Sequence, residues 1–174
     1  MAQQVSGLVQ GVPGVKFSAA QAMAAACTLL SELLGRHVTS RKIEPCCLTS
    51  GEQKNVACYE SEDHAVVAIC VCDKAISAYA GAALAMIPPM VAKESLAGGQ
   101  GGDFLLENFS EILNIWRQLF QKLNPRILTP QLFLKREDVP PAVAALLSKP
   151  KSRADAEINI AGYGSGQISI LIAV

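Results

Sequence analysis

Glu111 and Asn114 are the two residues of this chain whose types and spacing best suit chemistry. They are three positions apart in a segment expected to be helical, so their side chains project from one face. The carboxylate can pair with a partner's lysine and fix docking, and the amide can hold a water molecule by donating and accepting hydrogen bonds. Such a water can attack a phosphoryl group in line, a reaction that depends mainly on positioning and charge neutralisation. The pair therefore predicts phosphoryl hydrolysis on a partner, and the alternative is a hydrated polar stripe without chemistry.

A long amphipathic helix must position this pair. We expect it to begin after Asp103 as its N-cap and to end at Asn124-Pro125. Apolar residues recur every three or four positions on one side, which predicts a buried stripe. The opposite stripe is polar and consists of Glu107, Glu111, Asn114, Gln118 and Gln121. We expect Glu107 and Gln118, which flank the pair on this stripe, to contact the partner.

The remaining elements follow from local signals along the chain. Ser18 and Gln21 predict a capping box at the start of a first helix, and Gly35 predicts its end. Asp73 is expected to cap a helix over 74–87, which Pro88-Pro89 ends. The other expected elements are strands at 38–48, 54–60 and 64–72, a glycine-rich linker at 96–102, a strand near 127–134, a short helix opened by Pro140-Pro141, and hairpin strands at 156–163 and 167–174 around Gly164-Ser165-Gly166.

The order of these elements is similar in two halves of the chain. Each half has a long helix, a single strand and a hairpin, over about 16–95 and about 103–174. We therefore expect residues 1–174 to form a single domain, with residues 1–15 as a loose N-terminal arm. The predicted fold class is α/β (α+β), a pseudo-twofold sandwich of about six largely antiparallel strands with two long helices packed on one face.

The helix that carries Glu107, Glu111 and Asn114 resembles the motif helix of the CheC/CheX family of chemotaxis phosphatases. In that motif an acidic residue or serine is followed by glutamate and asparagine at the spacing found here. The resemblance implies hydrolysis of the aspartyl phosphate of a CheY-like response regulator, with Glu111 contacting the receiver's lysine and Asn114 orienting the water. It implies no cofactor of the chain's own, because the magnesium belongs to the phosphorylated receiver domain.

The first half departs from this motif, because it keeps Glu32 but has Gly35 where the asparagine would stand. The resemblance then implies one intact site, in the second half, as in CheX. The bulky Ile115, Trp116 and Arg117 that follow Asn114 differ from the small residues of the family. The alternative function is therefore a non-catalytic signalling or receiver-binding module with the same fold. Such a module would bind a receiver or another signalling partner through the helix that carries Glu107 and Glu111.

Composition limits the other classes of function. Fifteen basic and fifteen acidic residues leave a net charge of zero, which argues against a large nucleic-acid surface. The uncharged runs at 17–31 and 75–92 fit buried helices better than a signal peptide or a membrane span, so we expect a cytoplasmic protein without a membrane partner. The exposed edges of an open sheet also allow a homodimer.

Six cysteines occur without the paired C-x-x-C spacing of zinc sites, and we expect free thiols and no metal. A metal site formed by Cys58, His64 and Cys70 is the alternative.

Overall fold

The computed structural model describes residues 17–45 and 54–174. The expected arm at 1–15 and the end of the first expected strand lie outside these described residues. The elements are α1 (Ala19–Leu34), β1 (Val38–Lys42), β2 (Lys54–Glu60), β3 (Val66–Asp73), α2 (Lys74–Leu84), α3 (Pro89–Leu96), α4 (Gly102–Phe120), β4 (Gln131–Phe133), the 3-10 helix η1 (Arg136–Asp138), α5 (Pro141–Ser148), β5 (Ser152–Ile160) and β6 (Gly164–Ile172).

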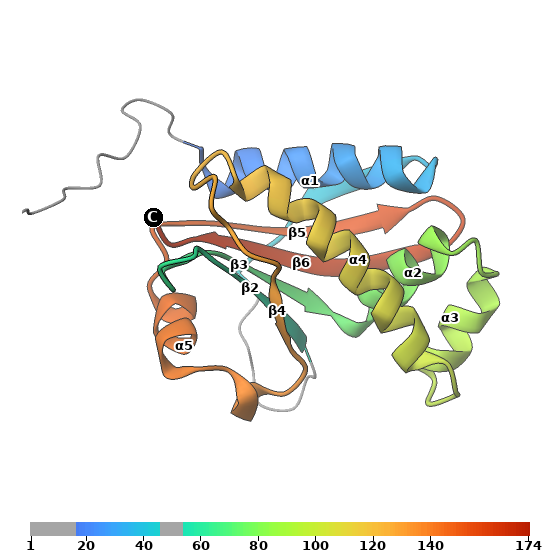
Figure 1. The fold of residues 1–174 in the computed structure, drawn as a ribbon. Coiled ribbons are helices and arrows are strands. Elements are labelled where there is room, and N and C mark those ends of the chain that lie inside the picture. The colour runs from blue at the N-terminus through green and yellow to red at the C-terminus, as the bar shows by residue number, and fades with distance from the viewer. Residues whose placement is uncertain (1–16, 46–53) are drawn as a thin grey trace, which may run out of the picture.

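The strands form one antiparallel sheet in the order β1-β5-β6-β3-β2-β4, which confirms the predicted fold class (Figure 1). The order is symmetric about the central β6–β3 pair. The hairpins β5–β6 and β2–β3 lie on either side of the centre, and each is flanked by a strand from the other half of the chain. β1 therefore pairs with β5 at one edge, and β4 pairs with β2 at the other.

The two faces of the sheet bury separate clusters. The larger cluster joins α1, α2 and α4 to one face, and Figure 1 shows α1 and α4 over the same side of the sheet. The smaller cluster joins Val143 of α5 to the opposite face, where it meets Val56 and Cys58 of β2. The predicted pair of long helices on one face is thus present, and α2 packs beside them.

The ends of α1 are as expected from the sequence. The side chains of Ser18 and Gln21 form a capping box, each accepting a hydrogen bond from the other residue's backbone N–H. Gly35 ends the helix with a φ of 58°, a left-handed conformation that glycine adopts without steric cost.

The segment between α2 and α4 differs from the prediction. α2 already ends at Leu84, and the short helix α3, which was not predicted, begins at Pro89. α2 ends before the prolines, because Ala85 caps it and Met86 adopts a left-handed φ of 55°. Pro89 opens α3, since proline at the first helical position has its φ preset and lacks only an N–H that would be unpaired there. Asp103 was wrongly predicted as an N-cap: Gly101 takes that position with a φ of 94°, and Asp103 lies in the first turn of α4.

The final hairpin turns earlier than predicted. Its turn lies at 161–163, where Gly162 has a φ of 84°, and Gly164 already begins β6. Gly166 has a packing role instead, since a Cβ there would lie 2.3 Å from the backbone nitrogen of Ile76 and 2.7 Å from Oδ1 of Asp73. Two further strands are shorter than expected: β1 ends at Lys42, and β4 spans only Gln131–Phe133.

The carboxylate of Asp73 joins α2 to the centre of the sheet. It accepts hydrogen bonds from the backbone N–H of Ile76, at 2.8 Å, and from that of Gln167 in β6, at 2.9 Å. Burial raises the pKa of Asp73 above its ordinary value, despite these two donors. The residue is therefore both the N-cap of α2 and a link between strand and helix.

Asp73→Asn is expected to lower the free energy of unfolding by about 1–2 kcal/mol at pH 7, because the amide offers only one oxygen to two N–H donors. The pKa of Asp73 is higher in the folded state than in the unfolded state, so the folded state binds the proton first as the pH falls. Between these two pKa values the wild type therefore gains stability on acidification. Asp73→Asn does not titrate there, so the wild type's advantage in free energy of unfolding increases. Urea unfolding of both proteins between pH 3.5 and 7 measures this. Asp138→Asn, at an exposed position, is the control, and its free energy of unfolding should stay close to that of the wild type. Equal stability of the wild type and Asp73→Asn at every pH would contradict the prediction.

None of the helices in the described ranges is long and apolar enough to cross a membrane.

Candidate functional site

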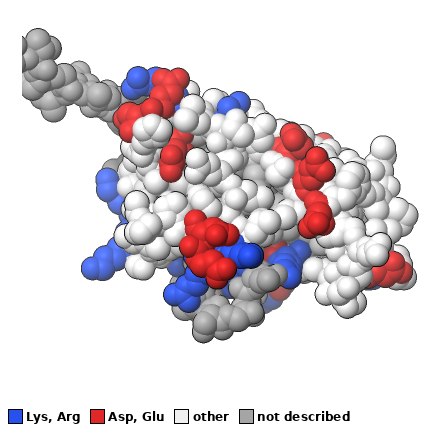
Figure 2. Space-filling model, turned by 60° about the horizontal axis from the view of Figure 1, so that its bottom comes forward, with Lys and Arg blue, Asp and Glu red and all other residues white. Residues whose placement is uncertain are grey.

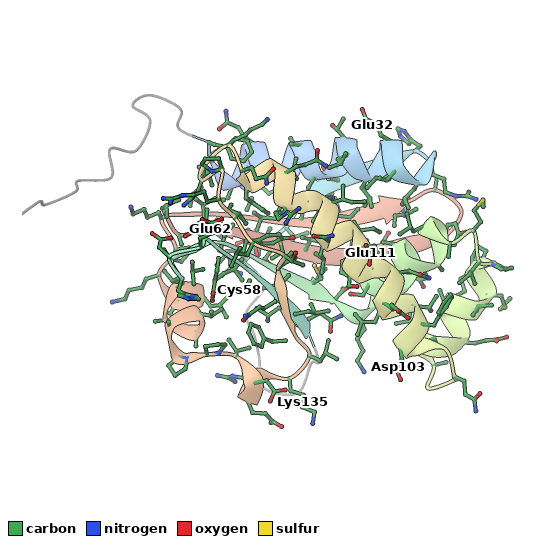
Figure 3. All side chains as sticks on the ribbon, in the orientation of Figure 1. Glu32, Cys58, Glu62, Asp103, Glu111 and Lys135 are labelled. Atoms are coloured by element: carbon green, nitrogen blue, oxygen red, sulfur yellow. The ribbon has the colours of Figure 1, made fainter. Side chains whose placement is uncertain are left out.

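The outward stripe of α4 carries all four residues predicted for the site. Glu107, Glu111 and Gln118 are exposed, and Asn114 is half-buried. The opposite side of the helix is in the core, as the apolar spacing predicted, with Phe109, Ile112 and Trp116 almost fully buried. Figure 3 shows Glu111 on the part of α4 that crosses the front of the molecule, and Asp103 near the start of the helix. The structure thus brings the predicted residues onto one accessible surface.

Tyr59 of β2 fixes α4 at the turn that holds this stripe. Its side chain is fully buried, and its hydroxyl donates a hydrogen bond of 2.8 Å to the backbone carbonyl of Leu113, the residue before Asn114. Its ring also packs on Phe120, with 4.6 Å between the ring centroids. Because a buried hydroxyl needs a hydrogen-bond partner, this bond ties β2 to the backbone of α4 directly before Asn114 and helps to fix the position of the helix there.

Gly81 of α2 sets how closely α4 approaches. A Cβ at Gly81 would lie 2.0 Å from the backbone oxygen of Leu105, a distance that no real contact allows. Its neighbours in α2 are mostly alanines, and Ala78, Ala80 and Ala82 are buried. The alanine-rich run of the sequence is therefore the surface against which α4 packs backbone to backbone.

Asn114 has an unsatisfied side-chain oxygen. Three buried side-chain polar atoms in the described part of the chain lack a hydrogen-bond partner, and all belong to α4: Nδ2 of Asn108, Oδ1 of Asn114 and Nε1 of Trp116. An unpaired buried polar group costs roughly 1–3 kcal/mol, so it favours any arrangement that gives it a partner. For Asn114 such an arrangement is at hand, because the neighbouring residues of its stripe are exposed.

Three carboxylates line the same face with a spacing of one helical turn. Asp103, Glu107 and Glu111 are all exposed, and within residues 17–45 and 54–174 none of them forms an ion pair. Figure 2 shows acidic side chains in a row at the right of this face, with Lys and Arg side chains gathered below and to the left of the row. Like charges four residues apart repel one another and weaken the helix slightly. Asp103 in the first turn is favourable to the helix dipole, but Glu107 and Glu111 gain no such stabilisation from the chain itself.

In the part of the first half that the structure describes, α1 carries no equivalent of the Glu111–Asn114 pair. Glu32 is exposed near the end of α1, but the helix ends at Leu34 and the left-handed Gly35 follows. Without a side chain, Gly35 cannot orient a water molecule. Among residues 17–45 and 54–174, the predicted pair is therefore present on α4 and not on α1.

The alternative metal site of Cys58, His64 and Cys70 is not assembled. Cys58 contacts the smaller cluster and Cys70 the larger one, so the two thiols lie on opposite faces of the sheet. Burial raises the pKa of both thiols to about 12, which disfavours the thiolate that a metal requires. No group of three or more His, Cys, Asp or Glu side chains in the described ranges is placed to hold a metal ion.

Two residues of this surface were not assigned to it from the sequence. Asp103 was interpreted as an N-cap, and Phe104, which is 54% exposed, was not considered. The recurrence of acidic residues at 103, 107 and 111 was the available signal for Asp103. Phe104 had no such signal, because an aromatic residue at the start of an amphipathic helix is normally buried.

Comparison with known proteins identifies the fold. No protein-family model and no curated protein sequence matches the chain. Among solved structures it is similar to FliY of Thermotoga maritima, with 17% identity, a TM-score of 0.54, and coverage of 88% of this chain and 84% of that one. It is also similar to the middle domain of FliM from H. pylori, with 13% identity, a TM-score of 0.56, and coverage of 88% and 86%.

A third match is to a chain of the CheX-CheY-BeF3-Mg²⁺ complex from Borrelia burgdorferi, with 12% identity, a TM-score of 0.50, and coverage of 88% of this chain and 96% of that one. The resemblance to the CheC/CheX family is thereby confirmed at the level of the fold. The same fold is present in FliY and in the FliM middle domain.

Proposed function

We propose that this chain binds a phosphorylated CheY-like receiver domain through the outward stripe of α4 and hydrolyses its aspartyl phosphate. The observation that carries the proposal is that α4 presents Glu111 and Asn114 together on an accessible face and is anchored from below by Tyr59. Rigid placement of a few polar groups is what phosphoryl hydrolysis needs from a protein. The solved complex of CheX with CheY supports a protein partner for this fold.

In this proposal Glu111 docks the receiver. Its exposed carboxylate pairs with a lysine beside the receiver's phosphorylated aspartate, which places α4 over the phosphoryl group. Asn114 then accepts a hydrogen bond from a water molecule through Oδ1, aligning the water's lone pair with phosphorus. The water forms a new P–O bond as the bond to the aspartyl oxygen breaks, and the products are inorganic phosphate and the free carboxylate. The receiver's magnesium neutralises charge on the phosphoryl oxygens.

The unpaired oxygen of Asn114 fits this role. Within the described part of the chain this oxygen has no hydrogen-bond partner, so turning the amide outward to a water molecule breaks no hydrogen bond of the chain. This favours formation of the reactive arrangement once a receiver is bound.

The second candidate is receiver binding without catalysis. The TM-scores to FliY and the FliM middle domain, 0.54 and 0.56, are at least as high as the 0.50 to the CheX complex. FliM of the same fold is also solved in a complex with SpeE. Glu111, Glu107 and Gln118 would serve as docking residues in this case, and Asn114 would have no part in chemistry.

Two measurements on a panel of receiver domains from the same organism separate these functions. The first is binding to each receiver in its beryllofluoride-activated, magnesium-bound form. The second is release of inorganic phosphate from each phosphorylated receiver, with and without the chain. Binding together with faster phosphate release supports the phosphatase, and binding with an unchanged rate supports the non-catalytic module. Neither binding nor acceleration with any receiver would overturn both.

A further inference from the structure

The corner where α2, α3 and α4 meet has an unusually apolar surface. Seven large hydrophobic side chains are exposed in the described ranges, and four of them lie between residues 86 and 104: Met86, Met90, Leu96 and Phe104. Leu96 ends α3 and Phe104 lies in the first turn of α4. These helix ends are in contact, since a Cβ on Gly102 would lie 3.1 Å from Oγ of Ser95.

Phe104 belongs to the same outward stripe as the candidate site. It precedes Glu107 by three residues and Glu111 by seven, spacings that align side chains along one face of a helix. Seven residues correspond to about 10 Å along the helix axis. A partner whose phosphoryl group lies at Glu111 and Asn114 therefore extends over Phe104 if it covers two further turns of α4.

We propose that Phe104 is the apolar anchor of the docking face, inserted into a pocket of the receiver domain whose rim is basic. This inference rests on the proposed function and adds a second contact point to it. The charge of the rim follows from the acidic row: Asp103 and Glu107 flank Phe104 and have no cationic partner within the described part of the chain. An exposed aromatic ring surrounded by charges of one sign is complementary to a pocket edged with the opposite sign.

The geometry specifies the partner's surface. Besides the lysine that meets Glu111, the receiver needs a basic side chain about 6 Å further along the helix for Glu107 and another about 12 Å away for Asp103. The pocket for Phe104 lies between these positions. Receivers without this arrangement bind weakly, even though their phosphorylation sites have the same chemistry.

Phe104→Ala tests the anchor, with Leu128→Ala as the matched control because Leu128 is similarly exposed, at 43%, outside α4. Binding to the beryllofluoride-activated receiver and phosphate release at saturating receiver are both measured. We expect Phe104→Ala to weaken binding about tenfold or more, as loss of a central aromatic contact does, with the saturated rate unchanged. Leu128→Ala should match the wild type. Phe104 is exposed, so its replacement does not remove a core contact.

The acidic row is tested by Asp103→Lys together with Glu107→Lys. We expect weaker binding and loss of most of its salt dependence, because the attraction between α4 and the basic rim is removed. Unchanged binding by Phe104→Ala, while the wild type binds and dephosphorylates the receiver, overturns the anchor and leaves the proposed function standing. A wild type that binds no receiver overturns the function itself. A change in the oligomeric state of Phe104→Ala alone would show that a second copy of the chain covers this face, and would also overturn the proposal.

Discussion

Asn114→Ala is expected to slow phosphate release from the bound receiver by roughly 30- to 1,000-fold, with little change in affinity. The range corresponds to about 2–4 kcal/mol, the loss found when one preorganised polar contact to a reacting group is removed. Affinity is preserved because Glu111 and the acidic row provide docking, and Asn114 contributes to the complex only through the water. The measurement is phosphate release at saturating receiver, together with binding to the beryllofluoride-activated form.

Asn108→Ala is the matched control for this variant. Asn108 is also a half-buried asparagine of α4 with an unpaired buried amide atom, but it is six residues before Asn114, about 9 Å away along the helix axis. Its replacement should leave both the rate and the affinity near wild-type values. An Asn114→Ala variant that releases phosphate as fast as the wild type would exclude the amide as the water-positioning group. Equal losses in both variants would point instead to a general disturbance of α4.

Gly81→Ala is expected to lower the free energy of unfolding by about 2 kcal/mol or more. Alanine gains roughly 1 kcal/mol over glycine in a helix interior, so an exposed position would be stabilised. Here the added methyl group would lie 2.0 Å from the backbone oxygen of Leu105, and backbone cannot rotate away as a side chain can. Overpacking costs about 1–3 kcal/mol, sometimes more, and a 2.0 Å approach to backbone lies at the upper end of that range, about 3 kcal/mol or more. After the helix gain of roughly 1 kcal/mol, a net loss of about 2 kcal/mol or more remains, and α2 and α4 are forced apart. Urea or thermal unfolding of the two proteins measures the loss.

Gly102→Ala provides the comparison within α4. The contact there is with Oγ of Ser95, at 3.1 Å, which can move by a rotamer change. This variant should differ from the wild type by less than about 0.5 kcal/mol. If Gly81→Ala were as stable as the wild type, the close approach of α2 and α4 would not limit the packing of the fold. If Gly81→Ala were less stable than the wild type but fully active, α4 would keep its position relative to the sheet even though α2 is displaced.

Local signals explain which parts of the fold could be predicted. The capping box of Ser18 and Gln21 and the left-handed Gly35 depend on contacts within one turn of chain, which sequence spacing encodes directly. The burial of α4 was predictable because its apolar residues keep a helical period over five turns. By contrast, α3 has eight residues and only Ala92 is buried, so it offers no comparable period.

Contacts between distant segments explain the rest. The turn of the last hairpin was misplaced because Gly166 is required by Asp73 and Ile76, ninety residues earlier in the chain, and not by a turn. In the site, the residue types and spacing of Glu111 and Asn114 were sufficient to place both on one face. The anchoring by Tyr59, the unpaired oxygen of Asn114 and the exposure of Phe104 all depend on tertiary packing, which spacing does not contain.

The symmetric strand order has a consequence for how the chain is made. The two central strands come from different halves, and β6, in the middle of the sheet, is the last of the six strands to be synthesised. Strand partners are also remote: Arg41 and Glu157, which pair across β1 and β5, are 116 residues apart. Until β6 leaves the ribosome, the backbone groups on one edge of β3 have no strand partner. The apolar faces of α1 and α4 also remain partly uncovered, because the central strand of the sheet that they pack on is missing. The nascent chain must therefore keep these surfaces from aggregating until β6 has been synthesised, and the centre of the sheet then closes in a late step.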